Sequence, residues 1–104
     1  MSNKKYNIRY LPLAQKDLNE IVSYLQTDSP DYAEKLIDQF DNEISQLILF
    51  PYKGKVPEDE SLKKKNYRML IIDNYIIFYV VFETNNLIEI RRIIHGKRKY
   101  KFLL

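Results

Sequence analysis

The only histidine of the chain lies in a segment whose residue types suit contact with a phosphate. His95 follows an apolar run at residues 88–94 and is followed at once by Gly96, Lys97 and Arg98. Imidazole transfers protons near neutral pH, glycine lets a backbone approach a ligand closely, and a guanidinium can bind a phosphate through two parallel hydrogen bonds. These residue types point to an anionic ligand, and to nucleic acid before any metabolite.

Three further arginines lie within apolar runs. Arg68 needs either a carboxylate partner or an anionic ligand to sit there, and Glu89 is the candidate partner. Arg91 and Arg92 are adjacent in an extended run, so alternation predicts that they point to opposite faces of a sheet. The same alternation places Arg91 on the face of His95, so that at most one of the two arginines joins a shared site.

A polar segment at residues 52–66 adds a second group of cations. Together with the nine tyrosines of the chain, cations provide the charge and stacking surfaces that single-stranded RNA requires. Lys99 and Lys101 are expected to be a solvated basic tail. The lysines of the polar segment are Lys53, Lys55, Lys63, Lys64 and Lys65.

The composition excludes several kinds of chemistry. There is no cysteine and only one histidine, so thiolate chemistry is excluded and no metal site is expected. The two glycines are isolated, so there is no phosphate-cradling loop, and no serine has a plausible triad. What remains is metal-free and cofactor-free chemistry on RNA, whose own 2′-OH is the nucleophile, or binding without chemistry.

The length predicts one small domain, and the charges are distributed unequally between its two halves. The 104 residues, 45% hydrophobic and 30% charged, predict one domain spanning 1–104. Neither a signal peptide nor a membrane span is visible, so a soluble cytoplasmic protein is expected. Residues 1–49 carry five Lys or Arg against eight Asp or Glu, and residues 50–104 carry twelve against six. This split predicts a basic working face and an acidic face with another task.

The periodicity predicts an α+β fold of order β-α-α-β-β-β, a helix hairpin packed on a mostly antiparallel sheet. Pro12 suits the first turn of one helix, and Ser29 with Pro30 suits the N-cap and first turn of the next, which Phe50 and Pro51 end. Residues 52–66 are expected to be a surface loop. The predicted strands are residues 6–11, 67–72, 75–82 and 88–94, with 75–82 central and buried on both faces.

At this point the chain resembles toxins of the RelE/ParE superfamily, the small toxic partners in type II toxin–antitoxin modules. The resemblance covers nearly the whole chain, through the order and spacing of its motifs. Those motifs are the strand 6–11, the helix opening Ala14-Gln15-Lys16-Asp17-Leu18, the helix end Leu47-Ile48-Leu49-Phe50-Pro51, the strands that begin at Tyr67 and Tyr75, and the closing segment 92–100.

The resemblance implies a growth-inhibiting toxin held inactive by a cognate antitoxin. Toxins similar to RelE and YoeB cut mRNA on the ribosome without a metal, which makes ribosome and mRNA the implied partners. The positions implied to be catalytic are Arg68, His95 and Arg98, with Tyr100 and Glu58 as looser matches. From their charge and clustering alone, the residues expected to contact RNA are Lys53, Lys55, Lys63, Lys64, Lys65, Arg91 and Lys97.

Two departures keep other functions open. Ile76 stands where the ribonucleases usually place an arginine, and Leu70 where RelE has a second lysine. The long acidic helix hairpin also resembles ParE, whose relatives poison DNA gyrase. The sequence places mRNA cleavage first and gyrase inhibition second, with a non-catalytic RNA-binding domain third.

Overall fold

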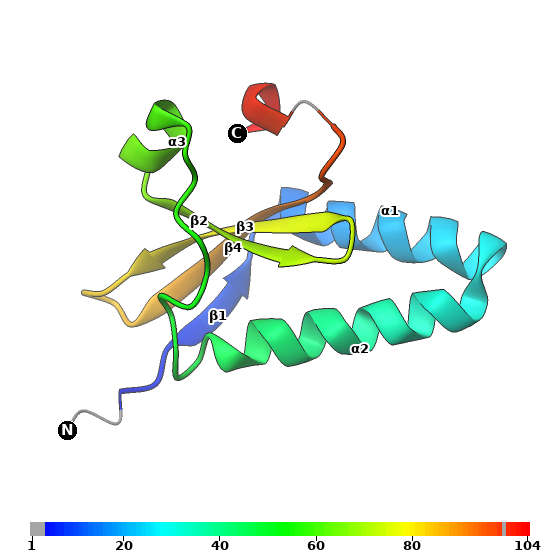
Figure 1. Ribbon diagram of the computed structural model, residues 1–104. Helices are drawn as coiled ribbons and strands as arrows, with labels where there is room; N and C mark the ends of the chain where they lie inside the picture. Colours follow the sequence, from blue (N-terminus) through cyan, green and yellow to red (C-terminus); the bar gives the residue numbers. More distant parts are fainter. Residues whose placement is uncertain (1–3, 99) are drawn as a thin grey trace.

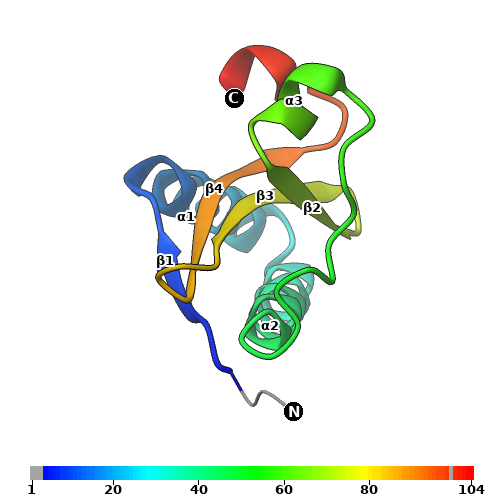
Figure 2. The ribbon, with the colours of Figure 1, turned by 90° about the vertical axis from the view of Figure 1, so that its left-hand side faces the viewer.

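The computed structural model of the protein describes residues 4–98 and 100–104, without the side chains of Lys101 and Phe102. Two long helices form a hairpin that packs against one face of a sheet (Figure 1), and shorter segments cover the other face (Figure 2). In chain order the elements are β1 (Asn7–Tyr10), α1 (Pro12–Asp28), α2 (Pro30–Gln46), α3 (Glu60–Lys64), β2 (Tyr67–Ile72), β3 (Tyr75–Phe82), β4 (Leu87–His95) and the 3₁₀ helix η1 (Tyr100–Leu103).

The sheet has the strand order β1-β4-β3-β2. β2, β3 and β4 form an antiparallel meander, while β1 runs parallel to β4. The helix hairpin therefore carries the chain away from β1 at one edge of the sheet and toward β2 at the other edge. Short turns then join β2 to β3 and β3 to β4. This arrangement confirms the predicted α+β class, the helix hairpin and the mostly antiparallel sheet.

Proline begins both long helices, as the sequence predicted. Pro12 and Pro30 occupy the first turns of α1 and α2, where a missing N–H costs no intrahelical bond. Ser29 is the N-cap residue of α2, but its side chain makes no capping hydrogen bond. Instead, its backbone N–H donates to the Leu25 carbonyl and its carbonyl accepts from the Ala33 N–H. A single residue thus joins the two helices.

The prediction of a loop throughout residues 52–66 was wrong, because Glu60–Lys64 form the short helix α3. Asp59 caps it: the carboxylate accepts the backbone N–H groups of Ser61 and Leu62 at 3.0 and 3.1 Å. Leu62 is fully buried and anchors the turn on the sheet. An acidic N-cap before a single apolar residue is a weak signal, which is why periodicity missed it.

Hydrophobic clusters lie on both faces of the sheet. The larger one fills the space between the helix hairpin and the sheet, and includes Ala14, Phe40, Ile77 and Tyr79. The smaller one, which we call the second core, lies on the opposite face. Its buried members are Leu62, Tyr67, Met69, Ile76, Phe78, Val80 and Ile94, with Tyr100, Leu103 and Leu104 packed against them. The middle of β3 is therefore buried on both faces, as predicted.

A β-bulge in β4 overturns the predicted placement of its arginines. The pairing with β3 shifts between Phe78 and Tyr79, so that Phe78 pairs with Arg92 and Tyr79 with Ile90. Arg91 is the extra residue. A bulge breaks the two-residue alternation of side chains, so Arg91 and Arg92 no longer point to opposite faces, and Arg91 does not share a face with His95.

Candidate functional site

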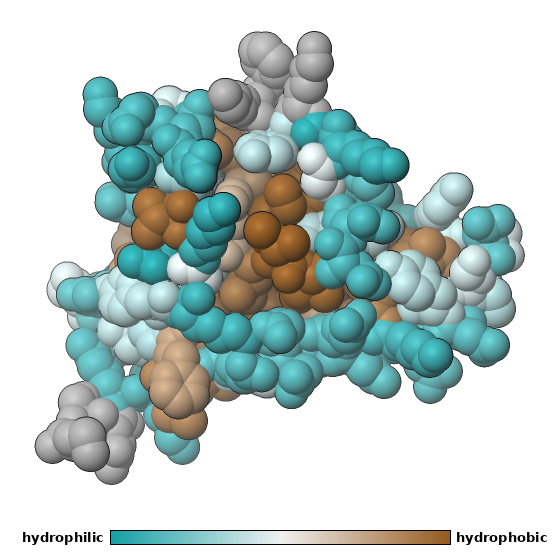
Figure 3. Space-filling view, viewed as in Figure 1, coloured by the Kyte–Doolittle hydropathy of each residue, from teal (hydrophilic) through white to brown (hydrophobic). Residues whose placement is uncertain are grey.

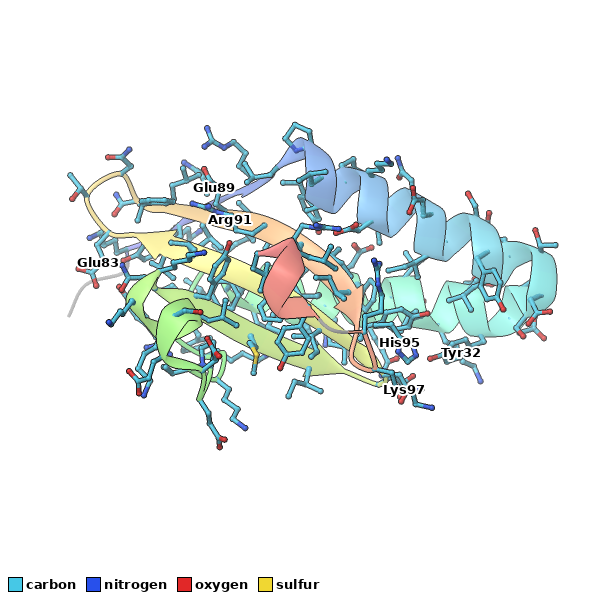
Figure 4. All side chains as sticks on the ribbon, turned by 90° about the horizontal axis from the view of Figure 1, so that it is seen from above. Tyr32, Glu83, Glu89, Arg91, His95 and Lys97 are labelled. Carbon is cyan, nitrogen blue, oxygen red and sulfur yellow. The ribbon has the colours of Figure 1, made fainter. Side chains whose placement is uncertain are left out.

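The residues predicted to act on RNA do not converge on one site. Figure 4 shows Glu89 and Arg91 toward one end of β4, and His95 with Lys97 at the other. Arg68 pairs with Tyr79 across the sheet, whereas His95 pairs with Tyr75, four residues away along β3 and on the opposite neighbouring strand. At ~3.3 Å per residue and ~4.8 Å per strand, Arg68 and His95 are too far apart for one phosphate.

The first group of predicted residues is at the end of β4, where His95 and Arg98 line a hollow of about 210 Å³ beneath α1. The edge of the His95 ring lies against Tyr75, with ring centroids 5.3 Å apart. The Nδ1 atom of His95 accepts the backbone N–H of Lys97 at 3.2 Å. Because Nδ1 accepts this bond, it is not available as a base, and a neutral imidazole held in this way carries its proton on Nε2.

The second group centres on Arg68, whose partners differ from the prediction. One terminal nitrogen of its guanidinium donates to the carbonyls of Tyr52 and Gly54, at 3.0 and 2.9 Å. The guanidinium carbon lies 4.8 Å from the centroid of the Tyr52 ring. The predicted carboxylate partner, Glu89, instead bonds to Arg9 and pairs with Arg91. Arg68 is therefore held by carbonyls and an aromatic ring.

The loop whose carbonyls bind Arg68 also forms hydrogen bonds with the side chain of Tyr79. The buried Tyr79 hydroxyl accepts the Gly54 N–H at 2.9 Å and donates to the Pro51 carbonyl at 2.8 Å. Tyr52, in the same loop, donates to Glu83, and burial together with this bond raises the pKa of Tyr52 to about 12. Sequence analysis treated the tyrosines as packing or stacking residues and did not predict that Tyr52 and Tyr79 would hold this loop in place. The only sign of such a contact in the sequence was Gly54, whose lack of a side chain allows a close approach.

The third group lies on the other face of the sheet. Glu58, Tyr100 and Lys55 line a hollow of about 410 Å³ whose floor includes Met69 and Leu62. The Tyr100 ring packs against Phe78, with centroids 5.1 Å apart. Two of the looser predicted matches thus lie together, but apart from both Arg68 and His95.

Several of the predicted RNA-binding cations already have protein partners. Lys53 pairs with Glu43 and bonds to Gln46 on α2, and Lys63 lies 3.4 Å from Glu60. Lys65 donates to the Leu104 carbonyl at 3.4 Å. Arg91 pairs with Glu89 at 2.8 Å and lies over the Tyr67 ring, with 6.0 Å to the centroid. Lys55, Lys64 and Lys97 are exposed. Lys99 and the side chain of Lys101 lie outside the described residues.

The sequence analysis also missed the most deeply buried ion pair in the described part of the chain. Asp17 on α1 accepts two hydrogen bonds from Arg92, at 2.7 and 2.9 Å, and a third from the Ile93 N–H at 2.9 Å. The bond to Asp17 raises the pKa of Arg92 above its usual range. Arg92 also donates to the Leu103 carbonyl at 3.3 Å. It therefore ties α1, β4 and the C-terminal segment together.

Comparison with known proteins identifies the family. The model of the ParE toxin family, described as the ParE toxin of type II toxin–antitoxin system parDE, matches residues 8–100. The chain belongs to this family. It is the toxin of a type II toxin–antitoxin system. No curated protein matches the sequence of this ParE-family toxin.

Two solved structures share the fold of the ParE-family toxin. A chain of the chromosomal ParDE system from P. aeruginosa superposes with a TM-score of 0.69 at 18% identity, covering 92% of this toxin and 100% of that chain. A chain of the toxin–antitoxin complex RelBE2 from Mycobacterium tuberculosis gives a TM-score of 0.60 at 18% identity, covering 88% and 98%. Within residues 4–98 and 100–104, no helix has the length and apolarity to cross a membrane.

Proposed function

We propose that this ParE-family toxin arrests growth by binding DNA gyrase rather than by cutting mRNA, reversing the order that the sequence favoured. The observation that carries the proposal is the dispersal of the predicted catalytic residues: Arg68, the pair His95 and Arg98, and the pair Glu58 and Tyr100 lie in three separate places. Cutting RNA requires a proton acceptor, a proton donor and cations around one phosphate.

The sheet face away from the hairpin supports the same proposal. It carries the second core, in which Ile76, Phe78 and Ile94 are buried beneath α3 and η1. A face occupied by apolar side chains and covered by the chain itself has little capacity to neutralise phosphates. A toxin of this kind would act through the shape and charge of its surface, and its target would lie in the cytoplasm.

One observation favours mRNA cleavage as a second candidate. His95 and Arg98 share a hollow with Tyr24 and Glu20, and a histidine, an arginine and a tyrosine can together serve phosphate chemistry. With Nδ1 occupied as an acceptor, a neutral His95 would donate a hydrogen bond from Nε2 to a phosphate or leaving oxygen, and other groups would have to remove the 2′-OH proton and protonate the leaving oxygen.

Induction of the toxin with separate readouts of translation and DNA breakage tests the proposal. We expect DNA breaks that depend on gyrase, with protein synthesis continuing at first. Purified toxin should inhibit supercoiling by gyrase in vitro and leave ribosome-bound mRNA intact. Arrest of translation, with mRNAs cut within codons and DNA intact, would refute gyrase as the target.

Two point variants test whether His95 and Arg98 contribute to toxicity. His95→Gln and Arg98→Ala should leave toxicity within about threefold of the wild type if the toxin acts by binding elsewhere. If the pair performs catalysis, each variant should lower the rate by ~10²–10⁴. Lys16→Ala, on the exposed surface of α1, is the control for a general effect of lost positive charge.

A further inference from the structure

A hollow of about 340 Å³ lies beside Arg68. It is separate from the hollow of the His95 group, with which it shares no lining residue. Figure 4 shows Glu83, which lines it, at the opposite end of the sheet from His95. Its other lining residues include Tyr52, Val56 and Lys63.

Arg68 lines this hollow and keeps hydrogen-bond donors that the protein does not use. A guanidinium carries five N–H groups, and Nη1 donates its two to the carbonyls of Tyr52 and Gly54. The N–H groups of Nε and Nη2 form no hydrogen bond with residues 4–98 or 100–104. The two carbonyls and the Tyr52 ring hold the guanidinium in place. A fixed guanidinium with free donors is suited to bind a carboxylate or a phosphate.

The other charges at the hollow favour a single carboxylate over the backbone of a nucleic acid. Lys63 supplies a second cation, and its exposed contact with Glu60, at 3.4 Å, engages it only weakly. Glu83 lies on the wall, where its carboxylate accepts the Tyr52 hydroxyl. A nucleic acid requires several cations to neutralise successive phosphates, and the acid in the wall would repel them. Two cations and one acid therefore match one isolated negative charge.

Exposed apolar side chains lie in the loop that borders the hollow, residues 49–56. The loop contains Leu49, Phe50, Tyr52 and Val56, which are all exposed, and Phe50 most of all at 63%. Figure 3 shows apolar side chains at the surface where α2 ends, directly before this loop. Exposed apolar clusters on a soluble protein mark contacts with other molecules, and aromatic side chains contribute much of the binding energy in protein interfaces.

The loop is held in one conformation before any partner binds. Its carbonyls and the Gly54 N–H are bonded by Arg68 and Tyr79. Its Lys53 side chain bonds to Glu43 and to Gln46 on α2. A surface that is ordered in advance loses less conformational entropy on association. The exposed side chains of the loop are therefore presented as a fixed binding surface.

We propose that residues 49–56 and the hollow beside Arg68 form the surface that binds gyrase. A carboxylate side chain of gyrase enters the hollow and meets Arg68 and Lys63, and apolar side chains next to it cover Phe50 and Val56. This proposal rests on gyrase being the target. It adds which surface of the toxin makes the contact, and which chemical group of the target that surface recognises.

Photo-crosslinking between purified toxin and purified gyrase tests the surface directly. p-Benzoylphenylalanine in place of Val56 should give a crosslinked product with gyrase. The same group in place of Leu13, an exposed leucine on α1, should give little or none. Crosslinking from position 56 that is no stronger than crosslinking from position 13 would overturn the proposal.

Substitutions test the charged and apolar parts of the surface separately. Lys63→Glu should weaken inhibition of supercoiling about tenfold, because it places a second acid in the hollow. Lys64→Glu makes the same charge change at an exposed neighbour that does not line the hollow, and should stay within about threefold of the wild type. Phe50→Ala should weaken inhibition about tenfold, and Leu13→Ala should change it little. Circular dichroism verifies that each variant folds.

The outcomes for surface and target are distinguishable. If wild-type toxin inhibits gyrase and well-folded Lys63→Glu and Phe50→Ala inhibit it equally well, the surface is wrong and the target stands. If wild-type toxin does not inhibit gyrase, the target proposal fails and the surface loses its occupant.

Two other results would assign the surface to a different partner and so overturn the proposal. Lys63→Glu could weaken binding of a single-stranded RNA oligonucleotide and leave gyrase inhibition unchanged, which would make the hollow a nucleic-acid site. Lys63→Glu and Phe50→Ala could escape neutralisation by the antitoxin and still inhibit gyrase fully, which would make the surface part of the antitoxin interface.

Discussion

Replacing Asp17 by alanine should destabilise the toxin more than any exposed acidic substitution. The carboxylate of Asp17 accepts three hydrogen bonds, two from Arg92 and one from the Ile93 N–H. The side chains of Asp17 and Arg92 are only 10% and 14% exposed. In the variant, Arg92 would keep the Leu103 carbonyl at 3.3 Å as its hydrogen-bond partner, and the Ile93 N–H would lose its acceptor.

The expected magnitude follows from this geometry. Removing one partner of a buried ion pair costs about 3–5 kcal/mol, because the other charge stays behind uncompensated. Arg92 keeps some contact with water, so we expect the lower end, ~3 kcal/mol of unfolding free energy. For a domain of this size, that loss lowers Tm by roughly 12–18 °C.

Urea unfolding followed by circular dichroism measures the loss, with two variants for comparison. Asp17→Asn keeps an acceptor for the Ile93 N–H and should lose less than alanine. Glu20→Ala, which removes an exposed carboxylate 4.0 Å from Lys16 on the same helix, should change stability by under ~0.5 kcal/mol. If Asp17→Ala costs less than ~1 kcal/mol, the ion pair does not hold α1 to β4.

Three further outcomes follow from the structure. Gly54→Ala should cost ~1–3 kcal/mol in urea unfolding, because the new Cβ would lie 2.5 Å from the Tyr79 hydroxyl and 2.8 Å from the Met69 carbonyl; unchanged stability would contradict the fixed loop. The hydroxyl of Tyr32 donates a hydrogen bond to the Asp73 carboxylate, and this bond raises the pKa of Tyr32 to about 12. The stability from that bond is complete below pH ~10 and lost as pH rises through about 12, so Tyr32→Phe should flatten this part of the stability–pH curve; an identical curve would refute the assignment. Association with the antitoxin should slow by roughly tenfold between low and physiological salt in stopped-flow measurements, and salt-independent rates would argue against electrostatic steering.

The architecture was predictable because it depends on periodic features of the sequence. Proline at Pro12 and Pro30, the helical apolar stripes and the turn at Asp73 and Asn74 each have a local physical cause. Because each of these causes acts within a few residues, a single sequence is sufficient to predict the helices, strands and turns. The strand order could not be predicted in this way, since β1 pairs with β4, about eighty residues away.

The site was less predictable because side-chain partners depend on irregularities. The bulge at Arg91 carries no signature in sequence, yet it changes which face each following residue occupies. The partner of Arg68 proved to be a pair of backbone carbonyls, which no side-chain pattern can reveal. Glu89, the predicted partner, was instead engaged by Arg9 and Arg91, from β1 and from its own strand.

The two departures from the ribonuclease pattern have a common physical explanation in the packing. Ile76 is 8% exposed and belongs to the second core, and Leu70 is 5% exposed and belongs to the core beneath the hairpin. A cation at either position would be buried without a described carboxylate partner, at a cost of several kcal/mol. The apolar residues at these positions are therefore required by the cores on the two faces of the sheet. A sheet packed in this way on both faces leaves the loops and the acidic hairpin as exposed surfaces. That distribution supports the proposal that the toxin acts by binding.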